Sequence, residues 1–118
     1  MEPRVHRAIR LMTRDLSREV SLNDVAQSLN LSASRLRHLF KAEMGLSPAR
    51  YLKARRLKEA KELLETSFLN VKQVMLKVGY NHRAHFVGEF KKSYGLSPSQ
   101  YRVQFLLDQQ VEEVPKLM

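Results

Sequence analysis

The sequence predicts an all-α fold of seven helices, in which two similar helical subdomains are joined by one long linker helix. Apolar residues recur at helical spacing along most of the 118 residues. One pattern occurs twice, as FKAEMGLSPARY at 40–51 and FKKSYGLSPSQY at 90–101. Between the two copies lies an uninterrupted amphipathic segment at 48–65, which predicts the linker.

The duplication is visible when the chain is aligned with itself. At an offset of fifty residues the identical pairs are Phe40/Phe90, Lys41/Lys91, Gly45/Gly95, Leu46/Leu96, Ser47/Ser97, Pro48/Pro98 and Tyr51/Tyr101. Upstream the match continues at an offset of forty-nine, with Leu22, Val25 and Leu29 corresponding to Val71, Val74 and Val78. The offset changes near Ser32 and Asn81, where a turn is expected. The chain therefore carries one helical unit in two copies.

The charge of the chain points to a polyanionic partner. The net charge is +9, and residues 1–104 hold 20 Lys and Arg against 9 Asp and Glu, a net charge of +11. Nucleic acid is the leading candidate for a body this basic. The absence of cysteine excludes disulfides and thiol chemistry and is compatible with a reducing cytoplasm. No apolar run approaches the roughly 18 residues of a membrane span, so a cytoplasmic location is expected.

The first subdomain is expected at 1–47 and contains three helices. The first helix is predicted over 3–18, and Arg7, Arg10 and Arg14 share its solvated or phosphate-facing side. The second begins at Ser21, which can cap it. The third covers about 33–44 and stops at Gly45, a residue that can take the left-handed conformation. The predicted buried positions are Val5, Ala8, Ile9, Met12 and Leu16, then Leu22, Val25, Ala26 and Leu29, then Leu36, Leu39 and Phe40.

The linker helix is predicted over 48–65, with Ser47 as its N-cap and Pro48 at the first helical position. Leu52, Ala60, Leu63 and Leu64 form its expected buried face, with Leu57 at the margin of that face. At 1.5 Å per residue this helix is about 27 Å long.

The second subdomain is expected at 66–104. After a loop at 66–69, Asn70 can cap a helix whose buried positions are Val71, Val74, Met75 and Val78. A helix at about 82–94 buries Phe86 and Phe90 and closes at Gly95, and a short helix runs from Pro98 to about residue 104. The tail at 105–118 has apolar residues followed by Pro115; both a continued helix and packing against the domain remain open.

A short helix, a turn of three to four residues and a second helix form the helix-turn-helix arrangement, and both subdomains show it. A helix that reads DNA must offer side chains to the base edges in the major groove. In the helix at 33–44, Arg37 can bond guanine O6 and N7 at once, and Ser34 and His38 can donate or accept. Taken alone, such a pattern on a helix is more often a plain solvated face.

Three segments together resemble the DNA-binding domain of the AraC/XylS family of bacterial transcription regulators: LNDVAQSLNLSASRLRHLFKAEMGLSP, RLKEAKELL and VGYNHRAHFVGEFKKSYGLSPSQYR. The resemblance covers about residues 5–104. Its spacing is most specific in the second copy, at Gly79, Phe86, Phe90, Gly95, Ser97, Pro98 and Tyr101. It implies a homeodomain-like domain that binds double-stranded DNA as a monomer. The helices at 33–44 and 82–94 would enter successive major-groove segments about 34 Å apart.

The resemblance maps the base-reading positions onto Ser34, Arg37 and His38 in the first copy and onto Arg83, Ala84, Val87 and Gly88 in the second. Phosphate contacts are expected from Ser32, Arg35, Lys41, Arg50, Asn81, His82, His85, Lys91 and Lys92. No cofactor or metal is expected. Contacts with RNA polymerase are implied by the family alone.

One departure from the family pattern lies in the second reading helix. Where many members have a polar residue followed by Arg, this chain has Val87 and Gly88. Gly88 has no side chain to bond a base edge, and Val87 offers only apolar contact to a thymine methyl group. The hypothesis is that the helix at 33–44 carries most of the sequence discrimination. The helix at 82–94 is then chiefly a backbone clamp through Arg83, Lys91, Lys92 and His85.

Other functions are less well supported. No nucleophile–base pair, glycine-rich phosphate loop or paired carboxylates occur, so an enzyme is not expected. His82 and His85 have a spacing that suits a metal, but no Cys and no well-spaced carboxylate completes the set. The main alternative is a helical protein-interaction module built from the repeat. Two repeats are fewer than such solenoids need.

Overall fold

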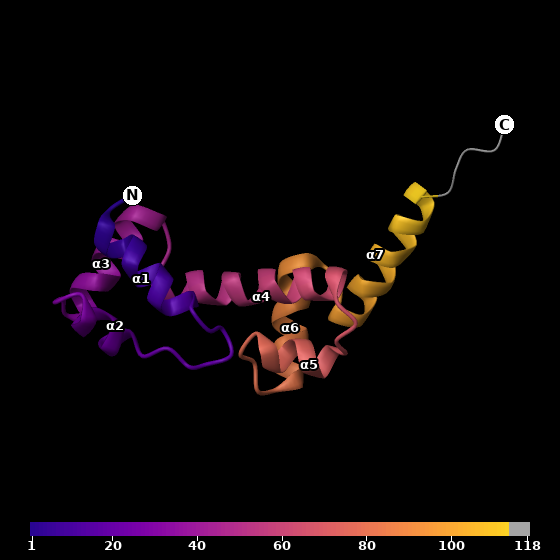
Figure 1. The fold of residues 1–118 in the computed structure, drawn as a ribbon, viewed down its shortest axis with the longest axis horizontal. Coiled ribbons are helices and arrows are strands. Elements are labelled where there is room, and N and C mark those ends of the chain that lie inside the picture. Colours follow the sequence, from indigo (N-terminus) through magenta and orange to yellow (C-terminus); the bar gives the residue numbers. More distant parts are fainter. Residues whose placement is uncertain (114–118) are drawn as a thin grey trace. The chain divides into compact units, whose positions relative to one another are not determined.

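The computed structural model describes residues 1–113, which form α-helices and no strand (Figure 1). The helices are α1 (Pro3–Thr13), α2 (Leu22–Ser28), α3 (Ala33–Met44), α4 (Pro48–Thr66), α5 (Val71–Lys77), α6 (Arg83–Tyr94) and α7 (Pro98–Glu113). The predicted all-α fold of seven helices with two helix-turn-helix subdomains is confirmed for this part of the chain.

The chain divides into two compact units within α4. Unit 1 ends at Arg56 and unit 2 begins at Leu57, so each half of the linker helix packs with its own subdomain. The expected boundaries, which set the linker at 48–65 apart from both subdomains, stay a prediction.

Unit 1 is a bundle of α1, α2 and α3 around one apolar core. The buried core residues are Val5, Ala8, Met12, Val25, Ala26, Leu29, Leu36 and Phe40. From the start of α4, Tyr51 and Leu52 pack against this core, and the rings of Phe40 and Tyr51 meet edge to face with centroids 5.5 Å apart. The first turns of the linker helix therefore belong to unit 1.

The turns of unit 1 have the predicted chemistry. The Ser21 hydroxyl accepts from the backbone N–H of Asp24 at the start of α2, and the Ser32 hydroxyl accepts from Arg35 at the start of α3. Gly45 ends α3 with φ +79° and donates its N–H to the Lys41 carbonyl at 2.9 Å. A side chain at this φ would be strained, which explains the glycine.

The prediction that the first helix extends to residue 18 is wrong, because α1 ends at Thr13. The Asp15 carboxylate accepts from the backbone N–H of Ser17 at 3.0 Å and from its hydroxyl at 2.6 Å. This local bonding competes with helical hydrogen bonds. Leu16, expected on the helical stripe, therefore lies in the connection between α1 and α2.

Unit 2 has its own core, and α4 contributes to it from Leu57 onward. The buried residues are Leu57, Ala60, Leu64, Val74, Met75, Val78, Tyr80, Phe86 and Phe90. Leu57, expected at the margin, is only 2% exposed, whereas Leu52 and Leu63 are half-buried. A single apolar stripe does not describe α4, because its two halves face two different cores.

The helices of unit 2 begin at well-defined caps. The side chain of Asn70 accepts from the Gln73 N–H, and the Gln73 side chain accepts from the Asn70 N–H, both at 2.8 Å. Ser97 and Gln100 form the same reciprocal pair at the start of α7, at 3.2 and 3.1 Å. Phe86 and Phe90 of α6 are fully buried, as predicted.

The last helix does not end near residue 104: α7 continues to Glu113, which is the first of the two possibilities left open for the tail. Its first turns are bound to the end of α4. Arg102 donates from Nε to the Leu64 carbonyl at 3.0 Å and from Nη2 to the Ser67 carbonyl at 3.2 Å. Beyond them the helix exposes Val103, Leu106 and Leu107. The rest of the tail, including Pro115, lies outside the described residues.

A second link between α4 and α7 is a small ionisable cluster. The Tyr101 hydroxyl donates to the Glu65 carboxylate, which also pairs with Lys61 Nζ at 3.1 Å. Burial raises the pKa of Tyr101 above its ordinary value of 10.0, and the hydrogen bond to Glu65 acts in the same direction. The hydrogen bond to Glu65 also raises the pKa of Lys61.

Replacement of Arg102 by Ala is expected to lower the free energy of unfolding by about 1–2 kcal/mol, because charged hydrogen bonds to the last carbonyls of α4 are lost. Urea unfolding followed by circular dichroism measures this change. Arg14→Ala, which removes an exposed arginine at the C-cap of α1, is the control and should stay within about 0.5 kcal/mol of the unaltered protein. Equal values for the two variants would contradict the role given to Arg102.

Alkaline solution is expected to destabilise unit 2. The folded state holds the Tyr101 proton more tightly than the unfolded state, so the resulting stability is complete below pH 10.0 and is lost as the pH rises through the raised pKa. Lys61 acts in the same direction. Thermal unfolding midpoints measured over a series of pH values across this range should fall less steeply for Tyr101→Phe than for the unaltered chain. Parallel curves would refute this account.

Candidate nucleic-acid interface

The outward face of α3 gathers four of the predicted DNA-contacting side chains. Ser34, Arg37, His38 and Lys41 recur at i, i+3, i+4 and i+7, on the side of the helix opposite to the buried Leu36 and Phe40. All four are exposed, and with Ala42 they line a hollow of about 440 Å³. The structure therefore brings the predicted base readers of the first unit together with Lys41.

The chemistry of this hollow suits a base edge beside a phosphate. No described residue forms a hydrogen bond or ion pair with the side chain of Arg37, His38 or Lys41. The cationic side chains of Arg37 and Lys41 can thus bind a partner without breaking an internal contact. The guanidinium of Arg37 can donate two parallel hydrogen bonds, the geometry that guanine accepts in the major groove.

The other predicted contacts of unit 1 surround this face. Arg35 is exposed on the flank of α3, and the Ser32 hydroxyl accepts from its N–H at 3.0 Å, which leaves the hydroxyl proton of Ser32 free to donate. Arg50 is exposed in the first turn of α4, where its backbone N–H donates to the Ser47 hydroxyl. The structure does not place these three side chains in the hollow.

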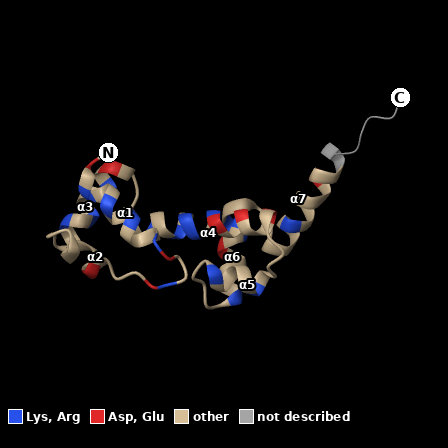
Figure 2. Ribbon diagram, viewed as in Figure 1, with Lys and Arg blue, Asp and Glu red and all other residues tan. Residues whose placement is uncertain are grey.

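The basic residues of α1 belong to a different surface. Figure 2 shows Lys and Arg on both α1 and α3. Arg7, Arg10 and Arg14 are exposed on α1, opposite to its buried Val5, Ala8 and Met12. Since α1 and α3 pack on one core through their apolar faces, their outward faces point in different directions. The α1 arginines are therefore not part of the α3 face.

In α6 the corresponding outward positions are Ala84, Val87, Gly88 and Lys91, each fifty residues after its counterpart in α3. Ala84, Gly88 and Lys91 are exposed and Val87 is half-buried. Arg83 is exposed as the first residue of the helix. Between Arg83 and Lys91 this face carries no polar side-chain atom, which distinguishes it from the face of α3.

The N-terminus of α6 also differs from that of α3. His82 is the N-cap, but its side chain makes no capping hydrogen bond. The first backbone N–H groups of α6 therefore lack a side-chain acceptor, an arrangement that suits a phosphate. Asn81 precedes them and is exposed.

Two predicted phosphate contacts of α6 lie away from its outward face. The ring of His85 packs on Tyr80, with centroids 5.5 Å apart. Lys92 follows Lys91 and lies on the same flank as His85, since residues seven apart return to one side of a helix. Both side chains are exposed, so they can reach a partner only at the edge of this face.

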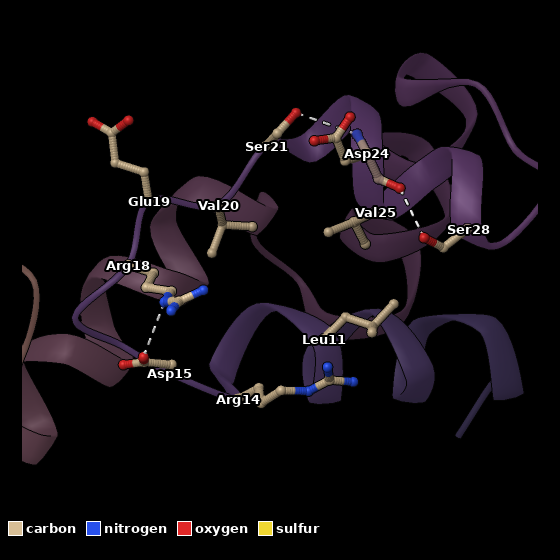
Figure 3. A pocket seen from close by; sticks show the side chains of 10 residues that line it. All are labelled: Leu11, Arg14, Asp15, Arg18, Glu19, Val20, Ser21, Asp24, Val25 and Ser28. Atoms are coloured by element: carbon tan, nitrogen blue, oxygen red, sulfur yellow. Dashed lines mark hydrogen bonds and ion pairs between the residues drawn. The ribbon is translucent and has the colours of Figure 1, made fainter.

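A second hollow of unit 1 is a cleft of about 520 Å³ between α1 and α2 (Figure 3). Leu11, Val20 and Val25 form its apolar part. Within it, Arg18 pairs with Asp15 at 3.5 Å, and the Ser28 hydroxyl donates to the Asp24 carbonyl at 3.0 Å. The contacts drawn in Figure 3 are this ion pair, this bond within α2 and the Ser21 cap, all of which belong to the local structure of the fold.

Within the described residues, no helix is both long and apolar enough to cross a bilayer. The two units each present a helix-turn-helix with the second helix facing outward, and this defines the class as a tandem helix-turn-helix domain. A family model described as "Helix-turn-helix domain" matches residues 25–104. The chain belongs to this AraC-type helix-turn-helix family, as the sequence resemblance predicted.

Known proteins agree with this assignment. The arabinose operon regulatory protein of Escherichia coli is 35% identical over 103 residues, which are 86% of this chain and 35% of that protein. The C-terminal domain of AraT, a response regulator from Geobacillus stearothermophilus, has a TM-score of 0.81 and 35% identity, and the match covers 87% of this chain and 86% of that one. The chain thus spans roughly a third of the arabinose regulator.

A third match supports the fold alone. The DNA-binding domain of AdpA, crystallised in complex with a target DNA, has a TM-score of 0.82 at 23% identity. The match covers 93% of this chain and 98% of that domain.

Proposed function

We propose that this chain is the DNA-binding part of a bacterial transcription regulator, and that it inserts α3 and α6 into successive major-groove segments of double-stranded DNA. The observation that carries the proposal is the grouping of Ser34, Arg37, His38 and Lys41 on the outward face of a helix-turn-helix second helix. Membership of a family of transcription regulators supports it, as does the likeness in fold to a domain crystallised with target DNA.

The proposed roles follow the exposure and chemistry of each side chain. Arg37, Ser34 and His38 read bases from α3, and Ala84 and Val87 face bases from α6. Arg83, which the family pattern also places toward the bases, acts chiefly as a clamp on the DNA backbone. Phosphates are bound by Ser32, Arg35, Lys41 and Arg50 around α3, and by Asn81, His82, His85, Lys91 and Lys92 around α6. Hydrogen-bonding side chains dominate on α3 and are sparse on α6, so α3 supplies most of the sequence discrimination.

The remaining parts of the proposal rest on the family. The domain binds one face of the duplex as a monomer, contacts RNA polymerase when bound, and is located at the nucleoid in the bacterial cytoplasm. No residue of this chain is assigned to the polymerase contact.

Arg37→Ala and Arg83→Ala should affect DNA recognition differently. Loss of a bidentate contact to guanine costs about 1–3 kcal/mol and relaxes the preference at one base position. Loss of Arg83 should weaken binding to all sequences by a similar factor. Selection from a random duplex pool followed by sequencing gives the preference of each variant. An equal loss of specificity in both variants would contradict the dominance of α3.

Binding to duplex DNA should depend steeply on salt. With Arg83 as a backbone clamp, the proposed phosphate contacts include six Lys or Arg residues: Arg35, Lys41, Arg50, Arg83, Lys91 and Lys92. Release of about 0.9 counterion per contact predicts a slope of about −5 in log K against log salt. Fluorescence anisotropy with a labelled duplex measures this slope. The alternative, a protein-interaction module, predicts no retention of duplex DNA even at low salt.

A further inference from the structure

The fold of the protein does not explain why residue 88 is a glycine. Gly88 lies in the middle of α6 and is exposed. It is not among the glycines with positive φ, which are Gly45, Gly79 and Gly95. Apart from its chain neighbours and the adjoining backbone of α6, a Cβ atom added at Gly88 would meet no atom within 4 Å. Neither the backbone conformation nor the packing of the free protein therefore requires glycine here, although glycine weakens a helix interior.

The position of Gly88 on the helix suggests what does require it. Gly88 is on the outward face of α6, four residues after Ala84 and directly after Val87. Its counterpart in α3 is His38, an exposed side chain of full size. With no side chain at residue 88, the backbone of α6 can approach a groove floor more closely than the backbone of α3 can.

The chemistry of the neighbouring side chains indicates what they would contact. Ala84 and Val87 present only methyl groups. Among the four bases, only thymine presents a methyl group in the major groove. Polar base edges would lose bonds to water against such a face without gaining a partner. A thymine methyl group, by contrast, is stabilised by apolar contact.

We propose that α6 reads thymine through its 5-methyl group, which packs against Val87 and Ala84, and that Gly88 provides the close approach for this contact. The inference rests on the proposed function, because it requires α6 in the major groove. Arg83 at the start of the face and Lys91 beyond it bind the flanking phosphates. Recognition by α6 is then modest and methyl-dependent, and it adds to the hydrogen-bonded recognition by α3.

The first test removes the methyl groups from the DNA. A duplex obtained by selection is synthesised with deoxyuridine in place of thymine in the half bound by α6, which leaves base pairing intact. The unaltered protein should bind the deoxyuridine duplex about three- to fivefold more weakly than the thymine duplex for each contacted methyl group. Val87→Ala should bind both duplexes with nearly equal affinity. Arg37→Ala is the matched control. This variant should bind both duplexes more weakly and keep the ratio between their two affinities.

The second test removes the close approach. Gly88→Ala should raise the thermal unfolding midpoint, because alanine favours the helix and the added Cβ meets nothing. The same variant should bind the thymine duplex at least about threefold more weakly. A stabilised variant that binds DNA less well is not explained by a structural role for Gly88.

The outcomes separate the inference from the proposed function. Tight binding that is unchanged by deoxyuridine would overturn methyl recognition and leave the DNA-binding function intact. Unchanged affinity of Gly88→Ala would overturn the role of close approach. Failure of the unaltered protein to retain any duplex at low salt would overturn the proposed function itself.

Discussion

Each unit depends on a pair of buried side chains that lie four residues apart in the second helix of its helix-turn-helix. Leu36 and Phe40 in α3, and Phe86 and Phe90 in α6, are all fully buried. Two anchors one turn apart fix both the position and the rotation of a helix on its core. The residues on the opposite side must then face outward, whatever their chemistry. Recognition positions are thus determined by apolar packing and not by the polar side chains that occupy them.

The parts of the fold that the sequence predicts well have strong local signals. Caps such as Asn70 and the left-handed Gly45 place helix ends from a few neighbouring residues. The predictions were wrong where a distant or competing contact decides. The Asp15–Ser17 bonds end α1 early. Leu57 is buried because α4 leaves one core and enters another there, which a periodicity count over one helix cannot show.

The candidate site divides in the same way. The four outward positions of α3 follow from helical spacing once the buried pair is known, and they line one hollow in the structure. The position of the His85 ring does not follow from helical spacing, because the ring packs on Tyr80, a residue outside α6. Arg102 was missed altogether. Its carbonyl partners lie about 35–39 residues away in the chain, and no sequence pattern marks an arginine that binds the end of another helix.

The duplication shows how the outward faces of α3 and α6 can differ while the two units keep the same fold. The two copies keep large apolar anchors at the same positions (Leu36 and Phe86, Phe40 and Phe90) and share their closing glycines, whereas the outward residues of α3 are polar or basic and those of α6 are mainly apolar. Outward residues touch no core, so they can change one by one with little effect on stability. One copy can then keep hydrogen-bonded reading while the other adopts apolar contact at close range. Under the proposed function, the asymmetry at His38 and Gly88 is therefore a difference in how DNA is approached and not in how the units fold.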